Sequence, residues 1–507
     1  MIYLTGSQLS FEEIERVMIK KEQVELSTKA REDIVKSRKL IDELVDNEET
    51  VYGVTTGFGK FSDTAISTKD INALQENLIL SHAAGVGEPF SEEIVRGIML
   101  LRANSLSKGH SGVRLETVKL LLDMLNEEIH PVIPSQGSLG ASGDLAPLAH
   151  MVLVMLGRGE AYYRGERLLG SEALKKAGLQ PIKLRAKEGL ALINGTQAIA
   201  SVGTFTWLSM KNLLKVADIA CAMTVDALEG ITDAFDERIY KLRPHPGHRK
   251  TAANLRKLVV NSEIIENKEH PRVQDAYTLR CVPQIHGASK DAHSHVGEVL
   301  EREINSTTDN PLIFSEDGDI ISGGNFHGQP LALPMDYLST SISEIANVSE
   351  RRVERLVNPN HNFGLPAFLI EEGGVSSGFM IAQYTAASLV SENKSLAHPA
   401  SVDSIPSSAN QEDHVSMGTI GARKALSILK NSQKVLSVEL LCACQALDLR
   451  KPRKPGKGTK KAFEIIREEI PYLDQDREIS PDIEKVAEII ASGKLVKAVE
   501  EVVGKLE

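Results

Sequence analysis

Apolar residues recur at helical spacing along most of the second half of the chain. Between residues 288 and 304 an apolar side chain stands at every fourth position. Apolar residues three or four positions apart share one face of a helix, so this spacing predicts long amphipathic helices. The pattern favours a mainly α fold with a long central helix bundle. Similar spacing covers residues 211–229, 338–356, 379–397 and 414–447.

The first hundred residues have a different pattern, in which short helical stretches alternate with glycines. We expect a smaller N-terminal globular region with active-site loops over residues 1–108. An elongated, mainly helical bundle domain is expected over residues 109–507. Within it, strand-like alternation is confined to short pieces such as residues 159–169. The clearest interruption, the basic stretch 451–458, predicts a solvated loop.

Composition narrows the class of protein. With 507 residues the chain is long enough to bury an active site deeply, and its net charge of −11 argues against nucleic acid or an anionic membrane as the main partner. The first residues lack a secretion-signal pattern, and apolar runs such as residues 151–156 are too short to span a bilayer. Four cysteines without CxxC spacing favour reduced thiols over disulfides. These features predict a cytoplasmic protein.

A cluster of small residues at 138–147 surrounds the tripeptide Ala141, Ser142 and Gly143. One interpretation is a loop that enters a helix, with Ser142 or Asp144 as the N-cap. The other is chemical: the Gly143 nitrogen attacks the Ala141 carbonyl carbon, and loss of two waters, one of them from Ser142, leaves a methylidene-imidazolone ring. Such a ring is a strong electrophile, which ordinary side chains do not supply.

Five further segments accompany the tripeptide in order along almost the whole chain. They are Val-Tyr-Gly-Val-Thr-Thr-Gly-Phe-Gly at 51–59, Leu-Ile-Asn-Gly-Thr at 192–196, Gln-Asp-Ala-Tyr-Thr-Leu-Arg at 274–280, Gly-Gly-Asn-Phe-His-Gly at 323–328 and Gln-Glu-Asp-His at 411–414. With Gly-Ala-Ser-Gly-Asp-Leu-Ala-Pro at 140–147 they resemble the aromatic amino acid ammonia-lyase family. The resemblance implies this family's helical fold and a homotetramer whose active sites combine several subunits.

The resemblance also implies the cofactor and the groups around it. The prosthetic group would be 4-methylidene-imidazol-5-one (MIO), formed from Ala141, Ser142 and Gly143, with no nucleotide and no metal. Tyr52 would be the base that removes the β-proton, while Tyr277 and Asn194 would hold the ring and the amino group. Without that resemblance, Tyr52 is equally an amphipathic tyrosine in a glycine-rich loop, and Asn194 the first residue of an Asn-Gly turn.

Three more side chains would bind the substrate. Arg280 would anchor the substrate carboxylate, a role that suits the planar fork of donors of a guanidinium group. Gln274 and Phe326 would shape the pocket. Read alone, Arg280 is an ordinary surface arginine.

The choice of substrate depends on Ser81, His82 and Glu412. Relatives that act on phenylalanine or tyrosine usually have a different pair at the position of Ser81 and His82, and typically lack the carboxylate of Glu412. An imidazole substrate can pair with His82 and Glu412, whereas a phenyl ring would leave each desolvated and unpaired at roughly 1 to 3 kcal/mol. The expected reaction is therefore deamination of L-histidine to trans-urocanate and ammonia, the first step of histidine breakdown. Taken singly, His82 is also readable as a helix histidine and Glu412 as a carboxylate at a helix N-terminus.

Other functions remain as alternatives. A tyrosine or phenylalanine lyase or aminomutase of the same family would share every residue except the three that select the substrate. An inactive scaffold or binding protein would be expected to lack the tripeptide, Tyr52 or Arg280, and all are intact. A zinc site is weakly suggested by the spacing of His293 with His295 and of His245 with His248, but neither pair has a third ligand in sequence.

Overall fold

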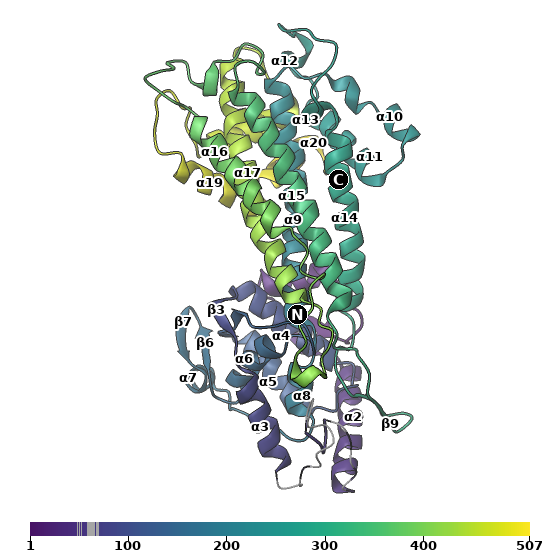
Figure 1. The fold of residues 1–507 in the computed structure, drawn as a ribbon. Helices are drawn as coiled ribbons and strands as arrows, with labels where there is room; N and C mark the ends of the chain where they lie inside the picture. The colour runs from purple at the N-terminus through teal and green to yellow at the C-terminus, as the bar shows by residue number, and fades with distance from the viewer. Residues whose placement is uncertain (48, 50, 52, 58–65, 67–69) are drawn as a thin grey trace. The chain divides into compact units, whose positions relative to one another are not determined.

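The computed structural model describes the chain except residues 48, 50, 52, 58–65 and 67–69 (Figure 1). Its described residues are mainly helical with a few short strands, so the predicted fold class is confirmed. The strands are β1 (Ile2–Leu4), β2 (Val24–Leu26), β3 (Val86–Pro89), β4 (Ile129–Pro131), β5 (Pro134–Gln136), β6 (Glu160–Tyr163), β7 (Glu166–Leu169), β8 (Leu312–Phe314) and β9 (Asp319–Ile321). The first helices are α1 (Phe11–Met18), α2 (Thr28–Asp46), α3 (Ile71–His82), α4 (Glu92–Leu106), α5 (Leu115–Asn126), α6 (Leu145–Met155), α7 (Gly170–Lys176) and α8 (Glu188–Ile193).

Four long helices cover stretches where helical spacing was predicted, namely α9 (Gln197–Ala227), α14 (Val282–Glu303), α15 (Gln329–Val357) and α17 (Gly418–Leu449). Of these, α9 begins 14 residues and α15 nine residues before the predicted start. The shorter helices of the second half are α10 (Glu237–Leu242), α11 (Pro246–Leu258), α12 (Glu263–Glu266), α13 (Tyr277–Arg280), α16 (Met380–Leu396), α18 (Lys457–Arg467), α19 (Ser480–Ala491) and α20 (Lys494–Val503). The described residues also include three 3-10 helices, η2 (Thr232–Phe235), η3 (Ala367–Leu369) and η4 (Ser408–Asn410).

The chain divides by its contacts into two compact units that alternate along the sequence. The first unit comprises Met1–Phe205, Gly297–Asp336 and Pro399–Arg423, and the second comprises Thr206–Val296, Tyr337–His398 and Lys424–Glu507. The division expected near residue 108 stays a prediction, because these units group residues by contact and not by order along the chain.

Short strands in the first unit connect its helices. The alternation over residues 159–169 forms the hairpin β6–β7, and β4 extends it to a three-stranded antiparallel sheet. In a separate pair, β3 lies antiparallel to β5, with Val86 opposite Gln136. Since β3 follows α3 and β5 precedes the small-residue loop, this pairing ties the end of α3 to that loop.

Buried ion pairs join the long helices of the second unit. Arg352 on α15 binds Glu439 on α17, with Nε 2.5 Å from Oε1, and both side chains are fully buried. Glu439 also accepts bonds from Thr224 on α9 and from Ser349 on α15. In this part of the bundle, these residues hold three helices side by side (Figure 1).

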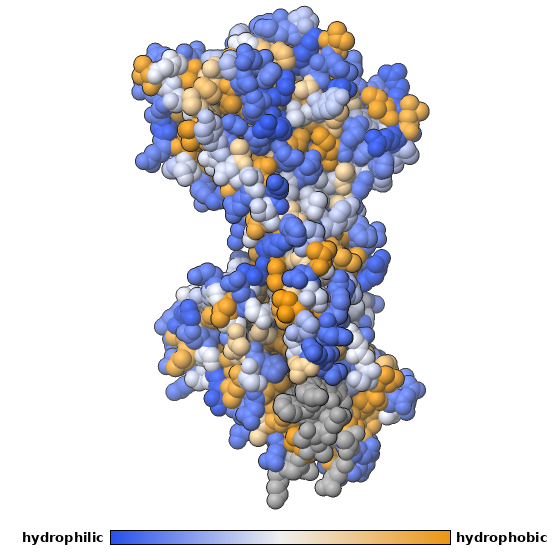
Figure 2. Space-filling model, in the orientation of Figure 1, coloured by the Kyte–Doolittle hydropathy of each residue, from blue (hydrophilic) through white to orange (hydrophobic). Residues whose placement is uncertain are grey.

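The four cysteines of the chain all belong to the second unit and are free. Cys221, Cys442 and Cys444 are buried, and burial raises the pKa of Cys221 and of Cys444 to about 12. The expectation of reduced thiols thus agrees with the structure. Within the described residues, no helix is long and apolar enough to cross a membrane. On the face in Figure 2, hydrophobic patches are small and interspersed with hydrophilic residues.

Candidate active site

A pocket of about 1340 Å³ opens in the first unit. It collects residues from α3, the small-residue loop, α8 and the loops at 322–327 and 408–414. Seven of the predicted site residues line it: Ser81, His82, Ala141, Ser142, Asn194, Phe326 and Glu412. Segments far apart in sequence are therefore brought together.

The backbone of the small-residue loop is bent in a way that only glycine allows at two positions. Gly140 has φ +64° and Gly143 has φ +72°, both in the left-handed region. A Cβ at Gly143 would overlap the carbonyl group of Gly195, and one at Gly140 would overlap Ser416 Oγ. The chain therefore passes close to its neighbours on both sides of Ala141 and Ser142.

Asp144 fixes the far end of this loop. It is fully buried just before α6, yet its carboxylate does not cap that helix. It accepts bonds from Thr419 Oγ1 at 2.6 Å and from the backbone nitrogen of Ile199 at 2.8 Å, and its own backbone nitrogen donates to Gly195 O at 2.7 Å. Burial raises the pKa of this carboxyl to about 6, and the hydroxyl and amide donors only partly offset that effect.

The hydroxyl of Ser142 reaches Glu412 on the opposite wall. Ser142 Oγ donates to Glu412 Oε1 at 2.9 Å, and Ser407 Oγ donates to the other oxygen, Oε2, at 2.7 Å. Glu412 lies six residues before α17 begins at Gly418, so it is not in the first turn of that helix. The alternative interpretation of Glu412 as a helix N-terminal carboxylate is therefore wrong.

The ring of His82 has its proton position set by Ser81. Ser81 Oγ donates its one proton to Leu78 O at 3.1 Å and lies 3.0 Å from His82 Nδ1. With the Ser81 proton on Leu78 O, Nδ1 is assigned as the donor and Nε2 as the acceptor of the neutral ring. Burial lowers the pKa of His82, while a hydrogen bond to the Leu78 backbone and, to a smaller extent, the charge of Glu412 oppose that shift. The neutral ring with an acceptor at Nε2 is the favoured form at neutral pH.

Asn194 ends α8 beneath the pocket and is almost fully buried. Its Nδ2 donates to Asn310 O at 3.2 Å. Its Oδ1 has no hydrogen-bond partner within the described part of the chain, and buried carbonyl oxygens normally have one. Such an oxygen can accept a bond from an ammonium group in the pocket.

Three predicted residues belong to the second unit. Tyr277 and Arg280 stand on α13, where the guanidinium carbon of Arg280 lies 4.6 Å from the centre of the Tyr277 ring, and Gln274 precedes them. Tyr277 is 67% exposed, and Arg280 Nε is buried without a partner among the residues described. Tyr52 lies outside the described residues.

Sequence reasoning missed several pocket residues. Asn310, His327 and His414 also line the pocket, and Ser407 supports Glu412 from behind it. His327 and His414 stand within segments that carry the family resemblance, which is the signal that could have found them. Ser407 lies in a Ser-Ser-Ala-Asn run whose composition indicates only a turn.

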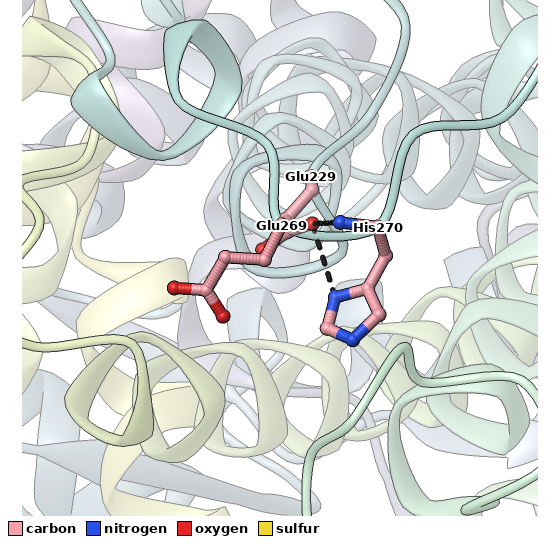
Figure 3. Close-up of side chains that lie close together, drawn as sticks. All are labelled: Glu229, Glu269 and His270. Carbon is pink, nitrogen blue, oxygen red and sulfur yellow. Dashed lines mark hydrogen bonds and ion pairs between the residues drawn. The ribbon is translucent and has the colours of Figure 1, made fainter.

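One side-chain group in the described residues has metal-ligand spacing, Glu229, Glu269 and His270 in the second unit (Figure 3). Arg453 lies 3.0 Å and Arg450 lies 3.5 Å from Glu229 Oε1, so guanidinium groups already neutralise this carboxylate. Burial raises the pKa of Glu229, but its hydrogen bond from His270 and the two arginines together lower it below the usual value. The group is an ion-pair cluster, and Arg453 is held there although a solvated loop was predicted.

Comparison with known proteins identifies the class. The family model for aromatic amino acid lyases matches residues 9–468, and the chain belongs to this family. As a member it is a carbon–nitrogen lyase, and membership implies a prosthetic group of the MIO type in general. The loop fits such a group, because Gly143 has no room for a side chain and Ser142 faces the pocket.

Individual relatives show how similar the chain is to family members with particular names. The chain is 72% identical to a protein of Natranaerobius thermophilus named histidine ammonia-lyase, over 507 residues and the full length of both. A solved histidine ammonia-lyase from Trypanosoma cruzi is 42% identical with a TM-score of 0.92, covering 99% of this chain and 95% of that one. A tyrosine aminomutase from Streptomyces globisporus is 36% identical with a TM-score of 0.94 over all of both chains.

Proposed function

We propose that this protein deaminates L-histidine to trans-urocanate and ammonia. The observation that carries the proposal is the pairing of Ser142 with Glu412 in a pocket that also contains His82. In the reaction the bond from Cα to nitrogen and one bond from Cβ to hydrogen break, and a carbon–carbon double bond forms. The names of the Natranaerobius and Trypanosoma proteins support the same substrate.

The prosthetic group is proposed to form from Ala141, Ser142 and Gly143. The left-handed backbone at Gly143 and the absence of a Cβ there allow its nitrogen to approach the Ala141 carbonyl carbon. Asp144 and Gly195 hold the end of the tripeptide through the bond at 2.7 Å. The mature group would supply an electrophile for the substrate. Since ammonium is a poor leaving group and the β-hydrogen is weakly acidic, elimination needs such activation.

Selection of histidine is assigned to two acceptors on the pocket wall. Neutral His82 presents Nε2 as an acceptor, and Glu412 presents a carboxylate oxygen. A protonated imidazole side chain offers two N–H donors, whereas a phenyl ring offers none. Binding phenylalanine would therefore leave both acceptors desolvated and unpaired, at roughly 1 to 3 kcal/mol each.

The remaining roles follow from the family resemblance. Tyr52 takes the β-proton, and Tyr277 with Asn194 holds the amino group. The unpaired Asn194 Oδ1 supports that assignment. Arg280 anchors the carboxylate, which its unpaired Nε supports.

The proposal includes a homotetramer that combines residues of several subunits in each site, with Gln274 and Phe326 shaping the pocket. The 55.3 kDa chain should then behave in solution as a particle of four times that mass, which light scattering after size exclusion can measure. A cytoplasmic location remains a prediction from composition.

The test offers L-histidine, L-tyrosine and L-phenylalanine in parallel and identifies each product. Urocanate alone is expected. Cinnamate, coumarate or a β-amino acid without urocanate would instead establish the phenylalanine or tyrosine lyase or aminomutase, and no turnover would indicate a scaffold. Mass spectrometry of the peptide that contains residues 141–143 should give a mass two waters below that of its sequence, and an unmodified mass in active protein would refute the prosthetic group.

A further inference from the structure

We propose that Ser407 is a positioning residue that selects an imidazole substrate by fixing the carboxylate of Glu412. The inference deepens the proposed function and depends on it. Ser407 Oγ donates to Glu412 Oε2 at 2.7 Å, while Ser142 Oγ donates to Oε1 at 2.9 Å. The two oxygens of one carboxylate therefore face two different serines.

Only one of these two serines keeps its hydroxyl in the mature protein. Formation of the prosthetic group removes the hydroxyl of Ser142, and with it the donor to Glu412 Oε1. Ser407 is distant in sequence from the tripeptide and keeps its hydroxyl. In the mature protein one oxygen of Glu412 therefore remains anchored, and the other is exposed to the pocket as an acceptor for a substrate N–H.

The backbone holds Ser407 opposite Glu412 through a short closed loop. Ser407 N donates to Glu412 O at 3.0 Å, and Glu412 N donates to Ser407 O at 3.3 Å. Between them, η4 has three consecutive residues at positive φ, namely Ser408 at +50°, Ala409 at +54° and Asn410 at +67°. L residues other than asparagine and aspartate rarely adopt this conformation, and such strain clusters where a site needs a fixed geometry.

A fixed carboxylate matters because of where His82 stands. Both groups line the pocket, and Glu412 is close enough to His82 for its charge to oppose the lowering of the His82 pKa. A carboxylate held by one oxygen loses less side-chain freedom when the substrate binds, which strengthens the bond from the substrate ring. Without the Ser407 hydroxyl, Glu412 would have to be ordered by the substrate itself.

The experiment compares Ser407→Ala with Ser407→Thr, which keeps the hydroxyl, and with Ser171→Ala on α7, an exposed serine outside the described pocket lining. For Ser407→Ala we expect KM for L-histidine to rise up to about tenfold, because the substrate must then order the Glu412 side chain on binding. The value of kcat should change by less than about twofold, since the reacting atoms are untouched. Ser407→Thr and Ser171→Ala should stay near the wild-type values.

Two measurements besides turnover make the test decisive. Calorimetry should show urocanate binding to Ser407→Ala weakened by a similar factor, up to about tenfold. The mass of the peptide with residues 141–143 should remain two waters low. Unchanged KM and urocanate affinity in Ser407→Ala would overturn the inference. An unmodified peptide mass in this variant would also overturn it, because Ser407 would then act on formation of the prosthetic group. A wild-type protein that makes no urocanate would contradict the proposed function instead.

Discussion

Two aspartates, one in each unit, are both fully buried but differ in the direction of their pKa shift. Burial raises the pKa of Asp144 in the first unit to about 6. Burial acts in the same direction on Asp218 in the second unit, but Lys290 and His286 more than reverse it and lower the pKa. Lys290 Nζ lies 2.6 Å and His286 Nδ1 2.8 Å from this carboxylate.

The pKa values of Asp144 and Asp218 shift in opposite directions because their hydrogen-bond donors differ, and not because one carboxylate is more deeply buried. Asp144 receives bonds from hydroxyls and backbone amides, which fix its geometry without placing a cation beside the tripeptide. Asp218 receives bonds from Lys290, His286 and Asn254, which join α9, α14 and α11. Cations therefore hold the carboxylate of Asp218 between helices, whereas neutral donors hold that of Asp144 beside the pocket. The contrast is one between sites and not between units, because the buried Asp226 of the second unit also has neutral donors and a raised pKa, and the buried Asp309 of the first unit pairs with Lys187. Four experiments test how buried charges are held in the two units.

The largest effect is expected for Asp218→Asn, because it leaves Lys290 buried without its counter-ion. The free energy of unfolding at neutral pH should fall by about 3 to 5 kcal/mol. Urea unfolding followed by the fluorescence of Trp207, the one tryptophan of the chain and a residue of the second unit, measures it. Adding Lys290→Met should recover part of the loss. A fall below about 1 kcal/mol would show that the ion pair is not what holds these helices.

A smaller loss is expected for Thr419→Val, which keeps the shape of the side chain and removes its hydroxyl from Asp144. Loss of a bond to a carboxylate should cost roughly 1.5 to 2 kcal/mol at neutral pH. Thermal unfolding against Thr419→Ser, which retains the hydroxyl, checks the cause. Equal melting temperatures for the valine and serine variants would mean that neutral donors do not support this carboxylate.

A net change within about 1 kcal/mol at neutral pH is expected for Asp144→Asn, because the lost bonds and the removed charge offset each other. The variant should differ mainly in its pH dependence. A carboxyl whose pKa rises on folding binds its proton more tightly in the folded state, so wild-type stability falls as pH rises from about 4 to about 6. The difference between the two unfolding curves over this window should amount to on the order of 3 kcal/mol. A constant difference would refute the raised pKa.

The smallest effect is expected at the cluster of Glu229, Glu269 and His270. Adding micromolar Zn²⁺ or Mn²⁺, or EDTA, should not change the melting temperature through this cluster. Arg450 and Arg453 repel a cation from this cluster. The melting temperature with and without metal is the measurement, and Glu269→Gln is the matched control. A metal-dependent rise in the wild type that disappears in Glu269→Gln would contradict the interpretation as an ion-pair cluster.

The sequence predicted the helices and much of the pocket wall, because both depend on patterns that are local in the chain. The spacing over 414–447 begins four residues before α17 and ends two residues before its last residue, and Ser81, Ser142 and Glu412 all line one pocket. It could not predict that Asp144 meets Thr419 or that Asp218 meets Lys290. Such pairs are separated by long stretches of chain, and only the packed fold brings their donors together.

The distribution of the cysteine thiols gives an independent way to observe the opening of each unit. All four thiols lie in the second unit, and three of them are buried. A thiol-reactive dye can label these three only when the second unit opens, so the labelling rate measures how often that unit opens. The first unit contains no cysteine and is silent in this assay. A thiol introduced there at an exposed position would allow each half of the protein to be timed separately in one sample.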